Sequence, residues 1–418
     1  MAKQNIIAAL DIGSGKITAV AATIDNQKNV VKILTGCEFV CEGVSCGVIG
    51  DIREAATTVQ NVLNYLEENA GGPICALYLA LRGKHIETYT NRGTLIISRI
   101  DRNITAEDIN QVLTNAKSIS LKNNFEILST VPQGFYIDKQ LVKSPEDMSG
   151  TSLEVDVHIT TGLKTTFDNI NKVIDRAKNW PLTGRLYGLV CLAETVLTQE
   201  DKDNGALLID MGKDTTSAGI YVNRSLICSY DLDFGSDLIT RDIAKCLHIS
   251  NKEAENIKIK YGVAFSSSYG NNDANEEIVI PSLYNREENK ISKEYLTEII
   301  RPRVQNIFDM VREKIQSSGF YDYAHTAVLT GGGSLLPGIK ELARTSLNIK
   351  HVACATVQRD LVECDEQYLN PTYATAVSLA YFVAKREIID TFSKGNVRNG
   401  SLFKGLAKKF KEWEIFGD

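Results

Sequence analysis

The sequence lacks the features that mark metal-binding, disulfide-bonded and membrane-spanning proteins. None of its nine cysteines forms a C-x-x-C pair, which gives no indication of a zinc or thioredoxin-like site, so we expect free cysteines in a reducing cytoplasm. No run reaches the roughly 18 apolar residues of a spanning helix. The apolar run before Asp11 is too short for a signal peptide. We therefore expect a chain that is neither secreted nor transmembrane.

The sequence also lacks an excess of basic over acidic residues. The 46 Lys and Arg residues against 52 Asp and Glu give a net charge of −6, which disfavours nucleic acid as the main partner. With 418 residues, the chain exceeds what one hydrophobic core usually supports, and its 43% hydrophobic content can fill more than one. Two or more lobes are expected.

Two glycine-bearing hairpins carry the clearest local pattern. The first is IIAALDIGSGKITAVAATID from residue 6, and the second is GALLIDMGKDTTSAGIYV from residue 205. In both, an apolar strand ends in Asp and a tight turn, and a second strand follows at once, unlike the strand-to-helix order of a Walker A loop. Two copies of one pattern predict an internally duplicated fold with one hairpin per lobe.

The hairpins suit phosphate binding. Glycine lets backbone N–H groups approach a phosphate closely, and two carboxylates, Asp11 and Asp210, could hold a hydrated magnesium from opposite sides of a cleft. Lys16 would add a point charge to the phosphate chain. A third glycine turn, Gly331–Gly333 in AVLTGGGSLLPGI, lies between a buried strand and a helix. Each motif alone is a common turn, but the three in this order are specific.

This order is the pattern of the actin-like ATPase superfamily, and within it the chain resembles the FtsA family of bacterial cell-division proteins. The resemblance covers most of the chain. It is carried by LDIGSGK (10–16), GKHIETYTNRGTLIISR and ITAEDI (83–109), VPQGFYID and MSGTSLEVDVHI (131–159), LTQEDKDNGALLIDMG (197–212), FGSDLITRDIAKCL and AENIKIKYG (234–262), IIRPRV (299–304) and LTGGGSLLPGI (329–339).

The resemblance implies a duplicated, ribonuclease H-like α/β fold of two lobes with an inserted α+β subdomain. The implied segments are lobe I (1–83 and 161–195), the insertion (84–160), lobe II (196–228 and 306–365), its outer subdomain (229–305), a helix returning to lobe I (366–390), a linker (391–400) and an amphipathic helix (401–418). The insertion is the more specific signal, because sugar kinases and chaperones share the phosphate motifs.

The resemblance also implies ATP and Mg²⁺ between the lobes. The nucleotide residues carried over are Asp11, Gly13, Ser14, Gly15, Lys16, Asp210, Gly212, Lys213, Asp214, Thr215, Thr216, Gly235, Glu255, Lys258, Gly331, Gly332, Gly333 and Ser334. A side chain at Gly332 is expected to occupy the space of the base. The alternative for Glu255 and Lys258 is that they form only a surface ion pair on one helix face.

One departure from the family pattern affects the second hairpin. The usual DIGGGTTD reads DMGKDTTS here, so Lys213 and Asp214 replace two glycines and Ser217 replaces an acid. Asp214 would repel phosphate unless it points away or meets magnesium. We therefore expect at most weak ATPase activity, with Glu194 as a water-positioning candidate.

The implied partners are other division proteins, copies of the chain itself in actin-like filaments, and the C-terminal peptide of FtsZ. Lys293, Arg301 and Arg303 lie among apolar residues in a stretch that we predict to be a helix pair with a kink or boundary at Pro302. This composition suits an acidic, apolar peptide. The alternative is a solvated helix face.

The last 18 residues are amphipathic and locally basic. On a helix, Leu402, Phe403, Leu406, Phe410 and Trp413 share one face opposite Lys404, Lys408 and Lys411. With Lys409 and Phe416, these residues are expected to bind the anionic cytoplasmic face of the membrane at the division site, weakly per tail and tightly in a filament. A helix docked on the body is the alternative. Two other functions stay open: a PilM-like pilus-assembly adaptor and a sugar-kinase-type enzyme.

Overall fold

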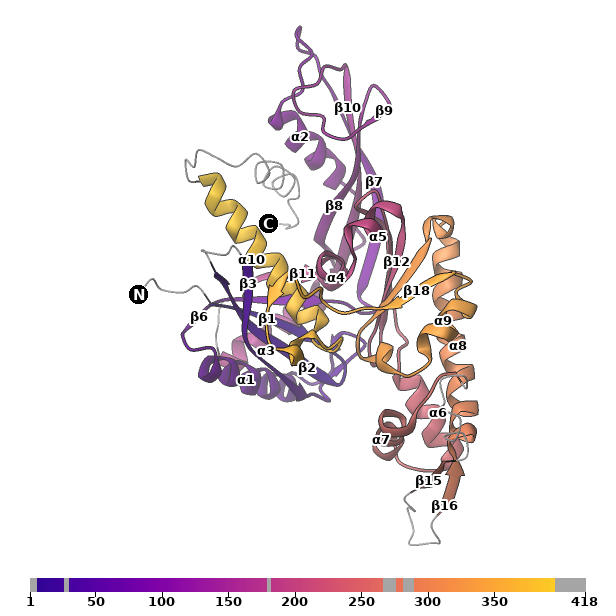
Figure 1. The fold of residues 1–418 in the computed structure, drawn as a ribbon. Coiled ribbons are helices and arrows are strands. Elements are labelled where there is room, and N and C mark those ends of the chain that lie inside the picture. The colour runs from indigo at the N-terminus through magenta and orange to yellow at the C-terminus, as the bar shows by residue number, and fades with distance from the viewer. Residues whose placement is uncertain (1–5, 26–29, 179–181, 266–275, 281–288, 395–418) are drawn as a thin grey trace.

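The computed structural model describes residues 6–25, 30–178, 182–265, 276–280 and 289–394. It shows two α/β lobes side by side, with a third sheet projecting from the region where they meet (Figure 1). The amphipathic segment 401–418 lies outside the described residues. Within the described part of the chain, no helix is long and apolar enough to cross a bilayer.

Lobe I is built on a six-stranded mixed sheet. Its spatial order is β11 (Leu182–Tyr187), β6 (Ile74–Leu81), β1 (Ile6–Ile12), β2 (Lys16–Asp25), β3 (Val30–Val40) and β19 (Val362–Glu363). Strands β1 to β3 are antiparallel, whereas β6 and β11 run parallel to β1. Every residue of β1 is buried, as expected for a strand covered on both faces.

Lobe II repeats this topology. Its sheet has the order β14 (Ser225–Leu232), β13 (Thr216–Val222), β12 (Ala206–Met211), β17 (Thr326–Thr330) and β18 (His351–Cys354). The register also repeats, because Asp11 pairs with Thr18 in the first hairpin and Asp210 pairs with Ser217 in the second. The predicted duplication is therefore confirmed down to the position of the two carboxylates.

Helices cover both sheets. Those of lobe I are α1 (Ile52–Asn69), α3 (Lys164–Lys178), α4 (Gly188–Val196) and α10 (Ala374–Lys394). Those of lobe II are α5 (Gln199–Asn204), which packs on β13, α6 (Asp237–Leu247), α7 (Asn251–Tyr261), α8 (Lys293–Ser317) and α9 (Ile339–Ser346). Helices α1 and α3 pack together on lobe I, and α10 returns from lobe II to pack on α4 and the lobe I sheet (Figure 1).

Short elements complete the two lobes. They are the hairpins β4 (Val44–Ser45) with β5 (Val48–Ile49) and β15 (Glu277–Ile280) with β16 (Asn289–Ser292), and the 3₁₀ turns η2 (Tyr321–Tyr323), η3 (Gly332–Leu335) and η4 (Glu366–Leu369).

The insertion is a four-stranded antiparallel sheet with one helix on it. The order is β7 (Ile86–Ile96), β10 (Ser152–Leu163), β8 (Phe125–Ile137) and β9 (Gln140–Val142), and α2 (Ala106–Lys117) packs on β7 and β10. Glycine is needed at Gly93, where a Cβ would lie 2.3 Å from the carbonyl oxygen of Val112. Helix α2 begins with a capping box, which Thr105 and Asp108 form.

The insertion also contacts lobe II through β14, the edge strand of that sheet. Gln133 Nε2 donates to the carbonyl oxygens of Leu226 and Ile227, both at 2.9 Å, and Thr88 Oγ1 donates to that of Ser229 at 2.7 Å. These side chains pair backbone groups that an exposed edge strand would leave to water or to another chain.

Helix α8 corrects one prediction. Instead of a helix pair divided at Pro302, residues 293–317 form one helix with Pro302 inside it. Proline removes one backbone hydrogen bond there. However, the buried residues Leu296, Ile300, Val304, Phe308 and Val311 continue one apolar stripe through it. Packing of that stripe on the lobe II core outweighs the lost bond.

Three of the expected segment boundaries fall inside a helix or a strand. The boundary after residue 305 falls inside α8, the one after 228 falls inside β14, and α10 continues to Lys394, past the expected start of the linker. These ends are set by packing of the whole element rather than by local composition.

Asp108 should make the stability of the insertion depend on pH. The Arg99 guanidinium and the Thr105 cap lower the pKa of Asp108 from 3.8 to about 2. Because the folded-state pKa is lowered, the stabilisation is fully present above pH 3.8 and is lost as the pH falls toward 2. Asp108→Asn should cost roughly 1 kcal/mol of unfolding free energy at pH 7 and little at pH 2.

The unfolding free energies can be measured at both pH values by urea denaturation, with far-UV circular dichroism as the signal. Glu107→Gln is the control, since Glu107 is an exposed acid in the same helical turn. An equal loss for Asp108→Asn at pH 7 and pH 2 would contradict the assignment.

Candidate functional site

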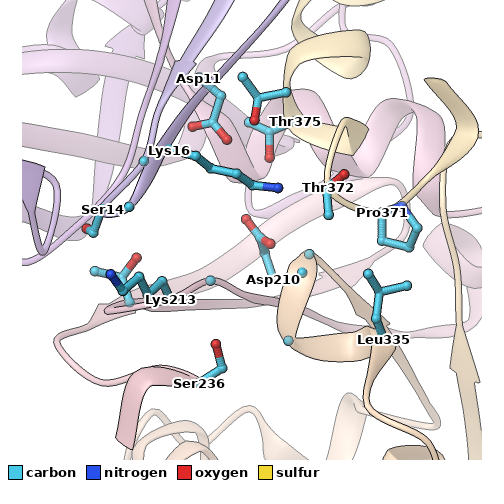
Figure 2. Close-up of a pocket in the computed structure, with 18 of the residues that line it drawn as sticks. Asp11, Ser14, Lys16, Asp210, Lys213, Ser236, Leu335, Pro371, Thr372 and Thr375 are labelled. Atoms are coloured by element: carbon cyan, nitrogen blue, oxygen red, sulfur yellow. The ribbon is translucent and has the colours of Figure 1, made fainter. Parts of the chain in front are cut away.

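A cavity of about 540 Å³ opens between the two lobes, with the two hairpin turns facing each other across one end (Figure 2). Of the predicted nucleotide residues, the following line it: Asp11, Gly13, Ser14, Gly15, Lys16, Asp210, Gly212, Lys213, Thr215, Glu255, Lys258, Gly331, Gly332 and Gly333. Segments from widely separated parts of the sequence thus meet at one site.

The two turns have the same backbone geometry. The N–H of Gly13 donates to the carbonyl of Lys16 at 3.1 Å, and that of Gly212 donates to the carbonyl of Thr215 at 2.9 Å. The two turns lie close together, because a Cβ on Gly15 would lie 2.5 Å from Cδ of Lys213. The Lys213 side chain of lobe II therefore lies against the first turn of lobe I.

Arg82 connects the two carboxylates, a contact that no sequence motif predicted. It follows β6, and its guanidinium donates to Asp11 through Nη2 and to Asp210 through Nη1. Both acids are buried, with 4% and 2% of their surface exposed. The position at which we expected magnesium is thus bridged by a cation of the protein itself.

Burial and charge act together on this cluster. Burial raises the pKa of Asp11, although the Arg82 charge opposes this. Burial alone would lower the pKa of Arg82, but Asp11, Asp210 and the nearby Asp231 raise it above its ordinary value. The arginine therefore stays charged. Burial likewise raises the pKa of Asp231, which accepts hydrogen bonds from Ser217 and Tyr187.

Asp214 and Lys213 point in different directions. Asp214 Oδ2 accepts a hydrogen bond from Ser45 Oγ of lobe I at 3.1 Å, and Asp214 does not line the cavity. The Asp214 carboxylate, which could have repelled a phosphate, therefore points out of the cavity. Lys213 stays in the cavity, and Lys16 pairs with Glu38 at 2.9 Å.

The opposite end of the cavity is apolar. Ile259 and Leu335 expose 74% and 50% of their surface there, and Pro371 and Thr372 lie across from Leu335 (Figure 2). Sequence reasoning missed these residues. Ile259 and Leu335 lie inside the motifs AENIKIKYG and LTGGGSLLPGI, whereas Pro371 and Thr372 lie in no predicted motif.

Glu255 and Lys258 form more than an exposed pair. Lys258 Nζ lies 2.7 Å from Glu255 Oε2 and donates to Thr240 Oγ1 at 2.8 Å, and Thr240 in turn donates to Glu255. Only 8% of the surface of Lys258 is exposed. Both residues line the cavity beside its apolar end.

The remaining predicted nucleotide residues shape the turns without lining the cavity. Thr216 Oγ1 donates to the carbonyl of Phe234 at 2.8 Å, and Ser334 Oγ donates to that of Gly331 at 2.7 Å. A Cβ on Gly235 would lie 2.4 Å from the Lys213 carbonyl oxygen, so this glycine lets the second turn pack closely.

The structure does not support Glu194 as a water-positioning residue. Its Oε1 accepts from the buried Lys202 at 2.9 Å, and it does not line the cavity. A glutamate at the end of a buried helix has its own charge partner here, which the local sequence does not reveal.

The predicted docking residues lie elsewhere, on α8. Lys293 pairs with Glu276 at 3.1 Å, and Arg303 pairs with Asp242 at 2.5 Å. Arg301 is exposed, and its guanidinium lies 5.1 Å from the centre of the Phe265 ring. Lys293 and Arg303 are therefore already neutralised within lobe II.

Comparisons with known proteins identify the family. A family model described as "Cell division protein FtsA" matches residues 207–378, and one described as "SHS2 domain inserted in FTSA" matches residues 83–161. The cell division protein FtsA of Borreliella burgdorferi is 30% identical over 414 residues, 98% of each chain. The chain belongs to the FtsA family. FtsA of Neisseria meningitidis is also 30% identical over 98% of each chain.

Solved structures of related fold agree with an actin-like architecture. A structure titled "PilM-PilN type IV pilus biogenesis complex" matches with a TM-score of 0.63 at 14% identity, over 90% of this chain and 98% of that one. MreB5 of Spiroplasma citri bound to ADP matches with a TM-score of 0.53 at 12% identity, over 94% and 99%. Such low identity shows the fold alone, whereas the FtsA relatives extend over nearly the whole chain. The pilus-adaptor and sugar-kinase alternatives are not retained.

The glycine turn of this FtsA-family chain gives a matched pair of tests. Gly331 has φ 81°, and a Cβ there would lie 2.2 Å from Asp210 Oδ1, whereas the nearest atom to a Cβ on Gly332 is 3.8 Å away. A methyl group at Gly332 would thus meet no protein atom closer than this, and the expected obstruction of a bound base there stays a prediction. Gly331→Ala should lower the unfolding free energy by about 2 kcal/mol, and Gly332→Ala by far less. Urea denaturation measures the unfolding free energy of both variants. Equal losses of unfolding free energy would contradict the close contact assigned between Gly331 and Asp210.

Proposed function

We propose that this FtsA-family protein binds ATP with Mg²⁺ in the interlobe cavity, polymerises, and attaches the division ring to the membrane. The observation that carries the nucleotide proposal is the cavity itself. Its hairpin turns and lysines lie at one end, its exposed apolar side chains lie at the other, and Glu255 and Lys258 lie between. Its volume of about 540 Å³ is within the usual range for small-molecule sites.

The hairpin end fits a divalent cation. Asp11, Asp210 and Asp231 carry three negative charges around one guanidinium. Oδ1 of Asp11 and Oδ1 of Asp210 are buried without a hydrogen-bond partner. Magnesium keeps most of its waters and needs few direct protein ligands, so Asp11 and Asp210 are the residues that would hold it. When bound, it would neutralise charge on the phosphate chain.

The acids of the cavity favour binding over catalysis. Among the described residues, those lining it are Asp11, Asp210 and Glu255. The first two are bound to Arg82, and the third is bound to Lys258 and Thr240. With nucleotide bound, magnesium would take the place of Arg82 as the partner of the first two acids. None of the three is then free to act as a general base, so we propose slow hydrolysis at most. Lys213 and Lys16 then serve as charges for the phosphates.

The other proposed contacts are with proteins and lipid. Membership of the FtsA family supports a place among division proteins on the cytoplasmic face of the membrane. We place the FtsZ C-terminal peptide on the α8 surface. There the exposed Arg301 and Tyr295 offer charge and apolar area, while Lys293 and Arg303 are paired within lobe II. Residues 401–418 supply the amphipathic membrane helix.

The apolar end of the cavity can be tested without changing the phosphate end. Leu335→Asp places a charge where the base should lie, and it should weaken Mg-ATP binding by roughly tenfold or more, which is at least about 1.4 kcal/mol. Because Leu335 is half exposed, the fold should persist. Leu141→Asp is the matched control, since Leu141 is 64% exposed on the insertion. Calorimetric titration decides: unchanged affinity in a folded Leu335→Asp variant would remove the site.

Membrane binding by residues 401–418 can be tested by liposome co-sedimentation. Trp413→Glu should abolish binding by placing a charge at the acyl boundary. Lys408→Ala with Lys411→Ala should weaken binding to anionic vesicles by about 1 kcal/mol per charge, and added salt should have the same effect. Tyr323→Glu, at an exposed aromatic residue of lobe II, is the control. A helix docked on the body would instead show a lower melting temperature for Trp413→Glu.

A further inference from the structure

Arg82 lies where one cation contacts a carboxylate of each lobe. Asp11 belongs to β1 of lobe I, Asp210 belongs to β12 of lobe II, and the guanidinium uses a different nitrogen for each. Only 14% of the Arg82 side chain is exposed. A divalent cation held by the same two acids would need the same position.

Both cations cannot occupy that position together. A metal held by the two acids, directly or through one water layer, would lie close to the guanidinium, and like charges at this separation in a buried site repel strongly. Oδ2 of each acid is already an acceptor for Arg82. A metal ion without other ligands therefore has little to gain by entering.

The cluster nevertheless keeps an excess of negative charge. Asp231 lies near Arg82 as a third acid, and it is already satisfied by Tyr187, Ser217 and the N–H of Gly83. Lys16, which also lines the cavity, is paired with Glu38. The single positive charge of Arg82 thus neutralises only part of the negative charge of the three acids, and a divalent cation would neutralise more of it.

The Arg82 side chain can move while its backbone stays. The carbonyl oxygen of Arg82 packs so closely on Gly47 that a Cβ on Gly47 would lie 2.1 Å from it. The next N–H, of Gly83, donates to Asp231 Oδ1 at 3.1 Å. The side chain, in contrast, lines the open cavity. A change of rotamer would carry the guanidinium away from the acids without disturbing either sheet.

We propose that Arg82 and the divalent cation of a bound nucleotide are alternative occupants of the position between Asp11 and Asp210. Without nucleotide, Arg82 holds the two lobes together through the acids and keeps isolated metal ions out. When nucleotide binds, Arg82 releases Asp11 and Asp210, which would then hold the metal, and its guanidinium turns to the phosphates. The exchange rests on the proposed nucleotide site, but the exclusion of metal can be measured without nucleotide.

Manganese binding to the nucleotide-free protein tests the exchange. Free Mn²⁺ measured by electron paramagnetic resonance should show weak binding to the wild type and binding roughly tenfold or more tighter to Arg82→Gln. Arg82→Lys, whose single ammonium cannot bridge both acids as a planar fork does, should gain less. Arg224→Gln is the matched control, because it removes an arginine paired with Asp203 on the surface of lobe II.

Thermal melting gives a second measurement on the same proteins. Mn²⁺ alone should raise the melting temperature of Arg82→Gln and leave that of the wild type unchanged. Equal Mn²⁺ affinity in the wild type and a folded Arg82→Gln variant would overturn the exchange. Should Arg82→Gln fail to fold, Arg82→Lys decides, and no gain in Mn²⁺ affinity there overturns it as well.

Titration with ATP separates this proposal from the nucleotide site. If no variant binds ATP but Arg82→Gln gains Mn²⁺ affinity, the nucleotide site fails while metal exclusion by Arg82 stands. If ATP binds and Mn²⁺ affinity is unchanged, the nucleotide site stands and the exchange fails.

Discussion

The bridge from Asp11 through Arg82 to Asp210 is the interaction on which the relation of the two lobes depends. Duplication of one hairpin brings two carboxylates into the same buried space, where neither could stay ionised without a partner. One guanidinium satisfies both, because its planar fork can donate in two directions at once. The cleft is therefore held by opposite charges as well as by covalent connections.

The sequence differences between the two hairpins explain how their turns pack beside this bridge. The first turn has small residues where the second has Lys213 and Asp214, and the two turns fit because they are unlike: Lys213 lies over Gly15, and Asp214 reaches Ser45. The departure from a glycine-rich turn thus adds contacts between lobes. It also leaves a lysine, rather than an acid, beside the proposed phosphate position.

The insertion is connected to both lobes. It begins directly after Arg82, and its strands contact β14, which follows the second hairpin. Gln133 and Thr88 pair carbonyl groups of that edge strand, while Asp231 at its end accepts from Gly83. The inserted subdomain therefore also covers the open edge of the second lobe, which would otherwise be available for unwanted strand pairing.

The sequence by itself determined the local elements of this protein: both hairpins, the capped helix of the insertion, the glycine turn and the family. Each of these depends on residues close together in the chain, where turn chemistry, capping and alternation act directly. Only the tertiary structure decided that Arg82 joins the two acids, that Leu335 faces the cavity, that Glu194 is held by Lys202, and that α8 continues through Pro302. Those outcomes depend on which distant groups meet in a buried space, and burial, charge pairing and packing there outweigh what the neighbouring residues prefer.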